Sequence, residues 1–203
     1  MKKLAVRFLG GLLLSLFAVL PAARADGVGV VKGTITIGGK PVGDAVVSIE
    51  ELPAGIAKAG APQKKVIDQR NMKFIPTVVA IRVGDSVEFP NHDKVWHNVY
   101  SKGGANDFDL GLYPPGKTRS QTFNKPGVSR ILCNAHPQME AFVVVKTHPF
   151  FSTTDSRGNY EIKNVPLGKV RVEVWAPNQE TKSANIEIVR SGEVIAVDFD
   201  LKK

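Results

Sequence analysis

The sequence predicts an all-β protein. Apolar or alternating runs of three to six residues recur along the chain, separated by clusters of Gly, Pro, Asn and Asp. Such runs are typical of strands, and the residues between them are typical of turns. After residue 25, apolar residues nowhere keep a helical spacing for more than about two turns. The predicted strands include Val46–Ile49, Val78–Val83, Ser86–Phe89, Arg130–Cys133, Phe142–Val145, Tyr160–Ile162, Val170–Trp175 and Val194–Phe199.

Residues 1–25 are predicted to be a secretory signal peptide. Three basic residues precede the apolar run Phe8–Leu20, and the small-x-small pattern Ala23-Arg24-Ala25 follows it. This order of charge, apolar stretch and cleavage pattern indicates an exported precursor and not a membrane span. We therefore expect a periplasmic protein with no membrane span after signal cleavage.

The charge of the expected mature chain argues against nucleic acid as a partner. Residues 26–203 hold 23 Lys and Arg against 19 Asp and Glu, a formal charge of +4. No stretch concentrates the basic residues as a phosphate-binding surface requires. Cys133 is the single cysteine. In an oxidising compartment an unpaired cysteine indicates an intermolecular disulfide, a reactive thiol or a metal ligand.

Four residues have the types and spacing of a mononuclear copper site. The stretch Cys133-Asn-Ala-His136-Pro-Gln-Met139 supplies a thiolate, an imidazole and a thioether, and His97 supplies a second imidazole. These are the ligands of blue-copper electron-transfer sites. Ligands at i, i+3 and i+6 cannot converge on an extended strand, so the chain must turn after Cys133. We predict His97, Cys133 and His136 as strong ligands of one copper ion and Met139 as the weak axial ligand.

Residues 64–147 resemble the cupredoxins, the plastocyanin and amicyanin family. The resemblance is carried by Val83-Gly-Asp-Ser-Val-Glu-Phe89, His97-Asn-Val99, Pro126-Gly127 and the Cys133 motif. It implies a Greek-key β-sandwich that carries electrons on a type I copper ion. It also implies that Asn98, beside the first histidine, ties the two ligand loops together and donates a hydrogen bond to the cysteine sulfur. An apolar patch for redox partners is implied around Pro137 and Ala135, with Leu112, Tyr113, Pro114 and Pro115.

The flanking segments resemble a different family. Gly39-Lys-Pro-Val-Gly-Asp-Ala-Val-Val47 and Asp155-Ser-Arg-Gly-Asn-Tyr160 look like the two halves of a carboxypeptidase regulatory-like, or transthyretin-like, β-sandwich. We predict that residues 26–52 and 150–203 form this second small sandwich, with the cupredoxin inserted into it. In the alternative arrangement, residues 28–50 add strands to the cupredoxin.

The predicted function is one-electron transfer between redox partners in the periplasm. A c-type cytochrome or a quinoprotein dehydrogenase would suit as partner, and no feature chooses between them. Catalysis is not expected, because no helix signal follows Cys133 and no second histidine set is present for a catalytic copper. The alternatives are a periplasmic copper-delivery protein, which the scarcity of Met disfavours, and a non-redox binding or scaffold module.

Overall fold

The computed structural model describes residues 27–52 and 60–202 as strands joined by turns and short loops. Within these ranges no helix is formed, and hence none that is long and apolar enough to cross a membrane. The predicted all-β, β-sandwich class is confirmed. The predicted signal peptide lies outside the described residues, as do residues 53–59.

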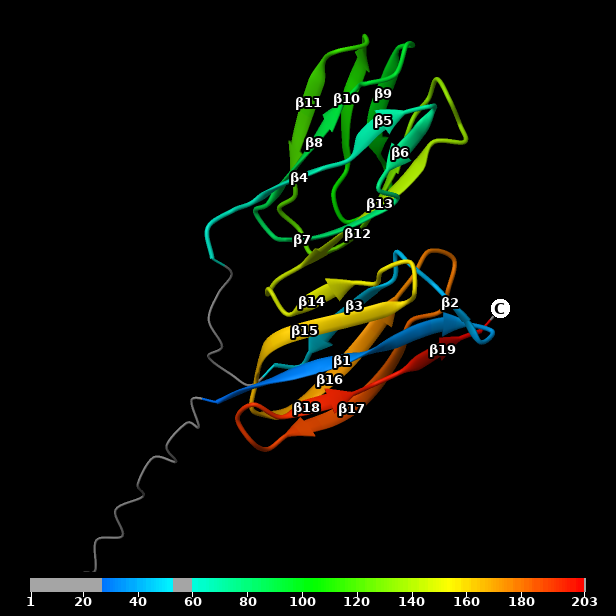
Figure 1. Cartoon of the computed structure of the whole chain (residues 1–203). Helices are drawn as coiled ribbons and strands as arrows, with labels where there is room; N and C mark the ends of the chain where they lie inside the picture. Colours follow the sequence, from blue (N-terminus) through cyan, green and yellow to red (C-terminus); the bar gives the residue numbers. More distant parts are fainter. Residues whose placement is uncertain (1–26, 53–59, 203) are drawn as a thin grey trace, which may run out of the picture.

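The middle of the chain forms one sandwich, in the upper part of Figure 1. One sheet has the order β10-β9-β12-β13-β7, the facing sheet the order β11-β8-β4, and β5 pairs with β6. Its strands are β4 (Lys64–Val66), β5 (Asp68–Arg70), β6 (Lys73–Ile75), β7 (Val78–Arg82), β8 (Ser86–Pro90), β9 (His97–Ser101), β10 (Phe108–Tyr113), β11 (Thr118–Thr122), β12 (Gly127–Leu132) and β13 (Glu140–Lys146).

The two ends of the chain together form the second sandwich, where blue and red strands lie side by side in Figure 1. One sheet centres on β1, which pairs with β15, β18, β19 and β2, and the other has the order β14-β3-β16-β17. The strands are β1 (Val28–Ile37), β2 (Lys40–Pro41), β3 (Val46–Glu50), β14 (Phe151–Thr153), β15 (Asn159–Pro166), β16 (Gly168–Trp175), β17 (Lys182–Ile188), β18 (Val194–Ala196) and β19 (Phe199–Leu201).

The pairing of β1 and β3 places the first segment of the chain with the last. Val31 lies opposite Ile162 in the β1–β15 ladder, and Ile49 opposite Val172 in the β3–β16 ladder. The pairing seen is thus with strands after residue 150 and not with strands of the middle sandwich. The middle sandwich is connected to the rest through β3 and β14, which are themselves neighbours.

Each sandwich has its own apolar core, and a third cluster joins them. The middle core includes Phe74, Phe89 and Phe123, all nearly or completely buried. Alternation explains this, since every second strand residue points inward. Between the sandwiches, Val46 of β3 packs with Val78, Ala80 and Val144, and partly buried aromatic residues surround them. The copper-ligand motif lies at the far end of the middle sandwich from this junction.

The run Val194–Phe199, predicted as one strand, is two. β18 pairs with Val30–Lys32 and β19 with Ile35–Ile37, so the ladder on β1 is interrupted at Val197 and Asp198 and resumes in the same register. At the interruption Asp198 Oδ1 accepts the Thr34 N–H at 2.6 Å, in place of a backbone carbonyl. Because the Asp198 side chain replaces a backbone carbonyl as the acceptor, the strand is divided although the apolar residues of Val194–Phe199 form one continuous pattern in the sequence.

Candidate metal centre

His97 opens strand β9 and has no exposed surface. The turn before it is closed by Asn91, whose side-chain amide donates to the carbonyls of Val95 at 2.9 Å and Tyr113 at 3.3 Å. Asn91 Oδ1 also accepts from the Asp93 N–H at 3.0 Å, the Asx-turn geometry that asparagine favours. A short, internally bonded turn therefore delivers His97 to the inside of the sandwich.

Cys133 is the first residue after strand β12 and is 3% exposed. The chain bends directly after it, at Asn134 and Ala135, and a turn follows in which the Met139 N–H donates to the His136 carbonyl at 2.9 Å before β13 begins. Asn134 and Ala135 lie on the surface, and His136 is half-buried. The turn required by the i, i+3, i+6 spacing is thus present, and it brings His136 back over the end of the strand.

Asn98 joins the two segments that carry these side chains. It is 4% exposed, and its Oδ1 accepts the Asn134 N–H at 2.7 Å. Its Nδ2 donates to Asp109 Oδ1 at 3.5 Å. The tie between β9 and the Cys133 loop that the sequence suggested is therefore made by this amide, whereas a donation from Asn98 to the Cys133 sulfur stays a prediction.

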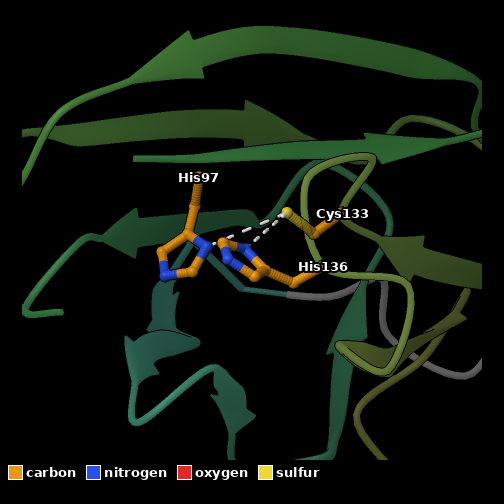
Figure 2. Close-up of side chains that lie close together, drawn as sticks. All are labelled: His97, Cys133 and His136. Carbon is orange, nitrogen blue, oxygen red and sulfur yellow. Dashed lines mark hydrogen bonds between the residues drawn. The ribbon is translucent and has the colours of Figure 1, made fainter. Parts of the chain in front are cut away.

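The side chains of His97, Cys133 and His136 converge, as Figure 2 shows. The Cys133 Sγ lies 3.9 Å from His97 Nδ1 and 4.0 Å from His136 Nδ1. All three atoms lie within 4.8 Å of one another. The two imidazole rings meet edge to face, with centroids 4.7 Å apart and an interplanar angle of 64°. Two strand ends thus present three donor atoms to one small volume.

These distances suit one metal ion. Metal–sulfur and metal–imidazole bonds of about 2.3 and 2.0–2.1 Å, set about 120° apart, separate the S and N atoms by about 3.8 Å. The observed separations, 3.9 and 4.0 Å, agree with this and exceed an ordinary hydrogen bond. One thiolate with two imidazoles is the donor set of trigonal blue-copper sites. The residues present therefore fit a copper ion.

The sequence reasoning missed Asp93. Its Oδ2 lies 3.1 Å from Nε2 of His97, the ring nitrogen that does not face Cys133. The same oxygen accepts the Met72 N–H at 2.6 Å. That bond, with those from Lys94 and His97, holds the pKa of Asp93 below its usual range. A carboxylate on the outer nitrogen orients a ligand imidazole and makes it a stronger donor. A carboxylate four residues before His97, within a turn, was the available signal.

Met139 lies in the same buried core cluster as Cys133 and is completely buried. It is adjacent in sequence to the turn that carries His136, and its role as axial ligand stays a prediction. The remaining two histidines lie elsewhere. His92 is exposed and its Nδ1 lies 2.9 Å from Asp68 Oδ1, whereas His148 lies at the junction of the sandwiches.

Comparison with known proteins identifies the middle sandwich. Residues 61–146 match the model of a family described as copper binding proteins of the plastocyanin/azurin family. Amicyanin-alpha of Methylorubrum extorquens is 30% identical over 105 residues, which cover 50% of this chain and 82% of that protein. The chain belongs to the plastocyanin/azurin family. Amicyanin of Paracoccus versutus is 28% identical over 106 residues, 51% of this chain and 80% of that protein.

A solved structure of an amicyanin mutant in the Cu(I) form is 28% identical, covers 49% of this chain and 98% of its own, and has a TM-score of 0.38. As a member of the plastocyanin/azurin family, the chain is a copper protein of the electron-transfer class. Its cofactor is one copper ion in a type I site, which the buried group of His97, Cys133 and His136 fits.

Proposed function

We propose that the chain is an exported, periplasmic carrier of single electrons between two redox proteins, and not an enzyme. The observation that carries the proposal is the buried sulfur of Cys133 with one Nδ1 atom at 3.9 Å and another at 4.0 Å. His97, Cys133 and His136 would hold the ion, with Met139 as the fourth ligand. Bound copper supplies one-electron chemistry by cycling between Cu(I) and Cu(II).

The protein's part is to keep the donor atoms in place while the charge at the site changes. Asp93 fixes the ring of His97 from the outside, and Asn98 fixes the loop that carries Cys133 and His136. Donors held by hydrogen bonds on two strand ends need little movement when an electron arrives or leaves. His136 is half-buried, so its ring edge offers a short path from solvent to the site.

The partners proposed are a c-type cytochrome or a quinoprotein dehydrogenase, because an electron carrier needs a protein donor and a protein acceptor. The signal-like segment at residues 1–25 supports the periplasm as location. For the second sandwich we propose a carboxypeptidase regulatory-like module that serves as a scaffold. Mass spectrometry of protein recovered from a periplasmic extract tests the location, with Asp26 as the expected first residue.

The deciding experiment is the visible spectrum of residues 26–203 after addition of one equivalent of Cu(II), beside a Cys133→Ser control. An intense thiolate-to-copper band that is absent in the control is expected. The band should disappear on reduction by ascorbate and return on reoxidation. A colourless protein, or a band that Cys133→Ser retains, would refute the electron-transfer proposal.

A further inference from the structure

Large apolar side chains are exposed around the entrance to the metal centre. Trp96 is 53% exposed and Val95 40% exposed, directly before the buried His97. Leu112, on the neighbouring strand β10, is 54% exposed. Its successor Tyr113 lies opposite His97 in the β9–β10 ladder, so Leu112 and Trp96 lie at the same end of the two strands. We call Val95, Trp96 and Leu112 the apolar face.

Tyr113, predicted from the resemblance to lie in such a patch, does not belong to it. It is 1% exposed, and its hydroxyl donates to the Phe89 carbonyl at 2.9 Å and accepts from Gln69 Nε2 at 2.5 Å. Burial raises the pKa of Tyr113 to about 12, against the effects of Gln69 and Arg119. The apolar face is therefore built from its exposed neighbours, among which Trp96 is the largest.

Four cationic side chains border the apolar face. Lys94 directly precedes Val95. The Lys117 carbonyl accepts the Asn91 N–H at 2.9 Å, which holds Lys117 beside the turn that precedes His97. Arg119 lies with its guanidinium carbon 5.1 Å from the centroid of the Tyr113 ring, next to Leu112. The fourth, Lys73, adjoins the turn that Asp93 binds. We call Lys73, Lys94, Lys117 and Arg119 the basic rim.

The basic rim is electrically unbalanced. All four side chains are exposed, and none makes an ion pair with any residue in the described ranges, whereas Lys64, Arg70 and Arg130 of the same sandwich do. The nearby carboxylates are already engaged: Asp68 with Arg70 and His92, and Asp93 with His97. Asp109, the remaining acid here, accepts the Gly111 N–H at 2.7 Å.

The same asymmetry appears in the whole chain. Residues 61–146 hold 12 Lys and Arg against 7 Asp and Glu, a net charge of +5. The rest of the expected mature chain, residues 26–60 and 147–203, holds 11 against 12, a net charge of −1. The positive charge thus belongs to the sandwich that carries the metal centre, and the four cations of the basic rim are a large part of it.

We infer that the apolar face and the basic rim together dock a redox protein whose own docking face is acidic. The inference rests on the proposed electron-transfer function and adds the charge of the partner. Rim charges steer diffusional encounter and raise association rates at low salt, while a small apolar centre permits rapid release. The rim sets the sign of the electrostatic field, and the apolar face lies at the end of β9 and β10 where His97 begins β9.

A copper-free measurement tests the field at the apolar face. In a Trp175→Phe background, Trp96 is the single tryptophan, since the chain has two. Its fluorescence is quenched at low ionic strength by iodide, by caesium and by neutral acrylamide. Relative to acrylamide, Lys94→Glu/Lys117→Glu should lower iodide quenching and raise caesium quenching, changing their ratio by about two- to threefold. The matched control is Lys40→Glu/Lys169→Glu, which makes the same charge change at exposed positions on the second sandwich that form no ion pair with any residue the structure describes.

A kinetic measurement tests the consequence for electron transfer. Hexacyanoferrate(III) takes one electron from the reduced, copper-loaded protein and becomes hexacyanoferrate(II), and stopped-flow absorbance follows the returning blue band. Its rate constant should fall as ionic strength rises, while that of cationic tris(phenanthroline)cobalt(III) should rise. At low salt, Lys94→Glu/Lys117→Glu should slow hexacyanoferrate by about tenfold, and the Lys40→Glu/Lys169→Glu control by less than about twofold.

Equal effects of the rim and control variants, in quenching or in kinetics, would overturn the inference and leave only a net-charge effect. Protein that is never blue would instead overturn the proposed function, and the quenching of Trp96 would still report the charge of the surface. The two failures are therefore distinguishable.

Discussion

The two ends of the cupredoxin sandwich use similar side chains for opposite purposes. Strand β12 runs from the junction, where Gly127 lines a cleft of about 400 Å³, to Cys133 at the metal centre. At the junction His148 and Lys146 both approach carboxylates. At the metal centre His97 has one nitrogen on a carboxylate and leaves the other facing a sulfur. A histidine beside a carboxylate thus stabilises the packing of the two sandwiches at the junction, and the same combination positions a metal ligand at the metal centre.

Charge pairing accounts for the difference. At the junction Lys146 Nζ lies 2.7 Å from Glu50 Oε1 and 3.6 Å from Glu173 Oε1, and Glu50 also accepts from Ser48 at 2.8 Å. The charged groups at the junction therefore pair with one another across the two sandwiches. At the metal centre three donor atoms face one another without a strong mutual bond. Buried side chains whose ligand atoms face one another without a strong bond indicate a metal site. The same residue types, when they form ion pairs with one another, indicate a structural contact between the sandwiches, which we call the joint.

Removing the cation of the joint should have the largest effect on stability. Lys146→Met leaves Glu50 and Glu173, each about one-quarter exposed, without their shared partner. A partly buried charge that loses its partner costs more than a surface pair, and we expect a loss of about 2–3 kcal/mol in the free energy of unfolding. Urea unfolding followed by fluorescence measures it.

The control for this variant is Lys163→Met, which removes an ion pair with Glu161 that is largely exposed on both sides. Such surface pairs contribute about 0–1 kcal/mol. Equal losses in the free energy of unfolding of the two variants would mean that the Lys146 ion pairs do not stabilise the contact between the sandwiches. The blue band of the copper-loaded protein should be unchanged in both, because Lys146 lies at the opposite end of β13 from the Cys133 loop.

Removing the carboxylate behind His97 should have the next effect, at the other end of the sandwich. Asp93→Ala deletes the acceptor that fixes the ring through Nε2. The loss of such an outer partner lowers metal affinity by about 10- to 100-fold. The copper affinity of Asp93→Asn, which keeps an acceptor without the charge, should lie between those of wild type and Asp93→Ala. Competition for copper with a chelator of known affinity measures this.

The matched control is Asp68→Ala. Asp68 lies 2.9 Å from His92 Nδ1, an equally close carboxylate–imidazole contact on an exposed ring outside the metal centre. Copper affinity should change by less than about twofold, since His92 holds no donor role. A loss as large as that of Asp93→Ala would show that the effect is general to the charge of this end and not specific to the His97 ring.

Local patterns in the sequence explain what could be predicted. Alternating apolar residues predicted most of the strands that were proposed, and the spacing of Cys133, His136 and Met139 indicated a turn that is present. The clustering of His97 with Cys133 required only that two strand ends meet. These features depend on residues a few positions apart or on a family pattern, so they can be seen in the sequence alone.

Contacts between distant segments could not be predicted in the same way. Lys146 and Glu50 are 96 residues apart, and neither differs in the sequence from an ordinary surface charge. The break between β18 and β19 depends on one bond from Thr34 to Asp198, 164 residues away. Tyr113 was expected in a surface patch because its loop resembles the one that faces the copper site in cupredoxins, yet its hydroxyl finds two buried partners. Such choices are made by packing, which the sequence pattern does not record.

The joint should also depend on pH, and this is the smallest effect expected. His148, Lys146 and Ser48 together hold the pKa of Glu50 well below its ordinary value of 4.5, against the opposing effect of burial. A depressed folded pKa means that the stabilisation is fully present above pH 4.5 and is lost as the pH falls below it, since the unfolded chain binds the proton first. The metal centre, at the other end, has no part in this change.

The measurement is the urea midpoint of wild type and Glu50→Gln from pH 6 to pH 3.5. Other acids with depressed pKa values, among them Asp85, Asp155 and Asp200, also lose stabilisation over this range, so only the difference between the two proteins reports Glu50. Wild type should be the more stable at pH 6, and about 0.5–1 kcal/mol of that advantage should be lost by pH 3.5, a value reduced for solvent screening. Parallel curves would mean that Glu50 has the same pKa in the folded and unfolded chains. In that case apolar packing of Val46 and its neighbours, and not the ion pairs, would be what joins the two sandwiches.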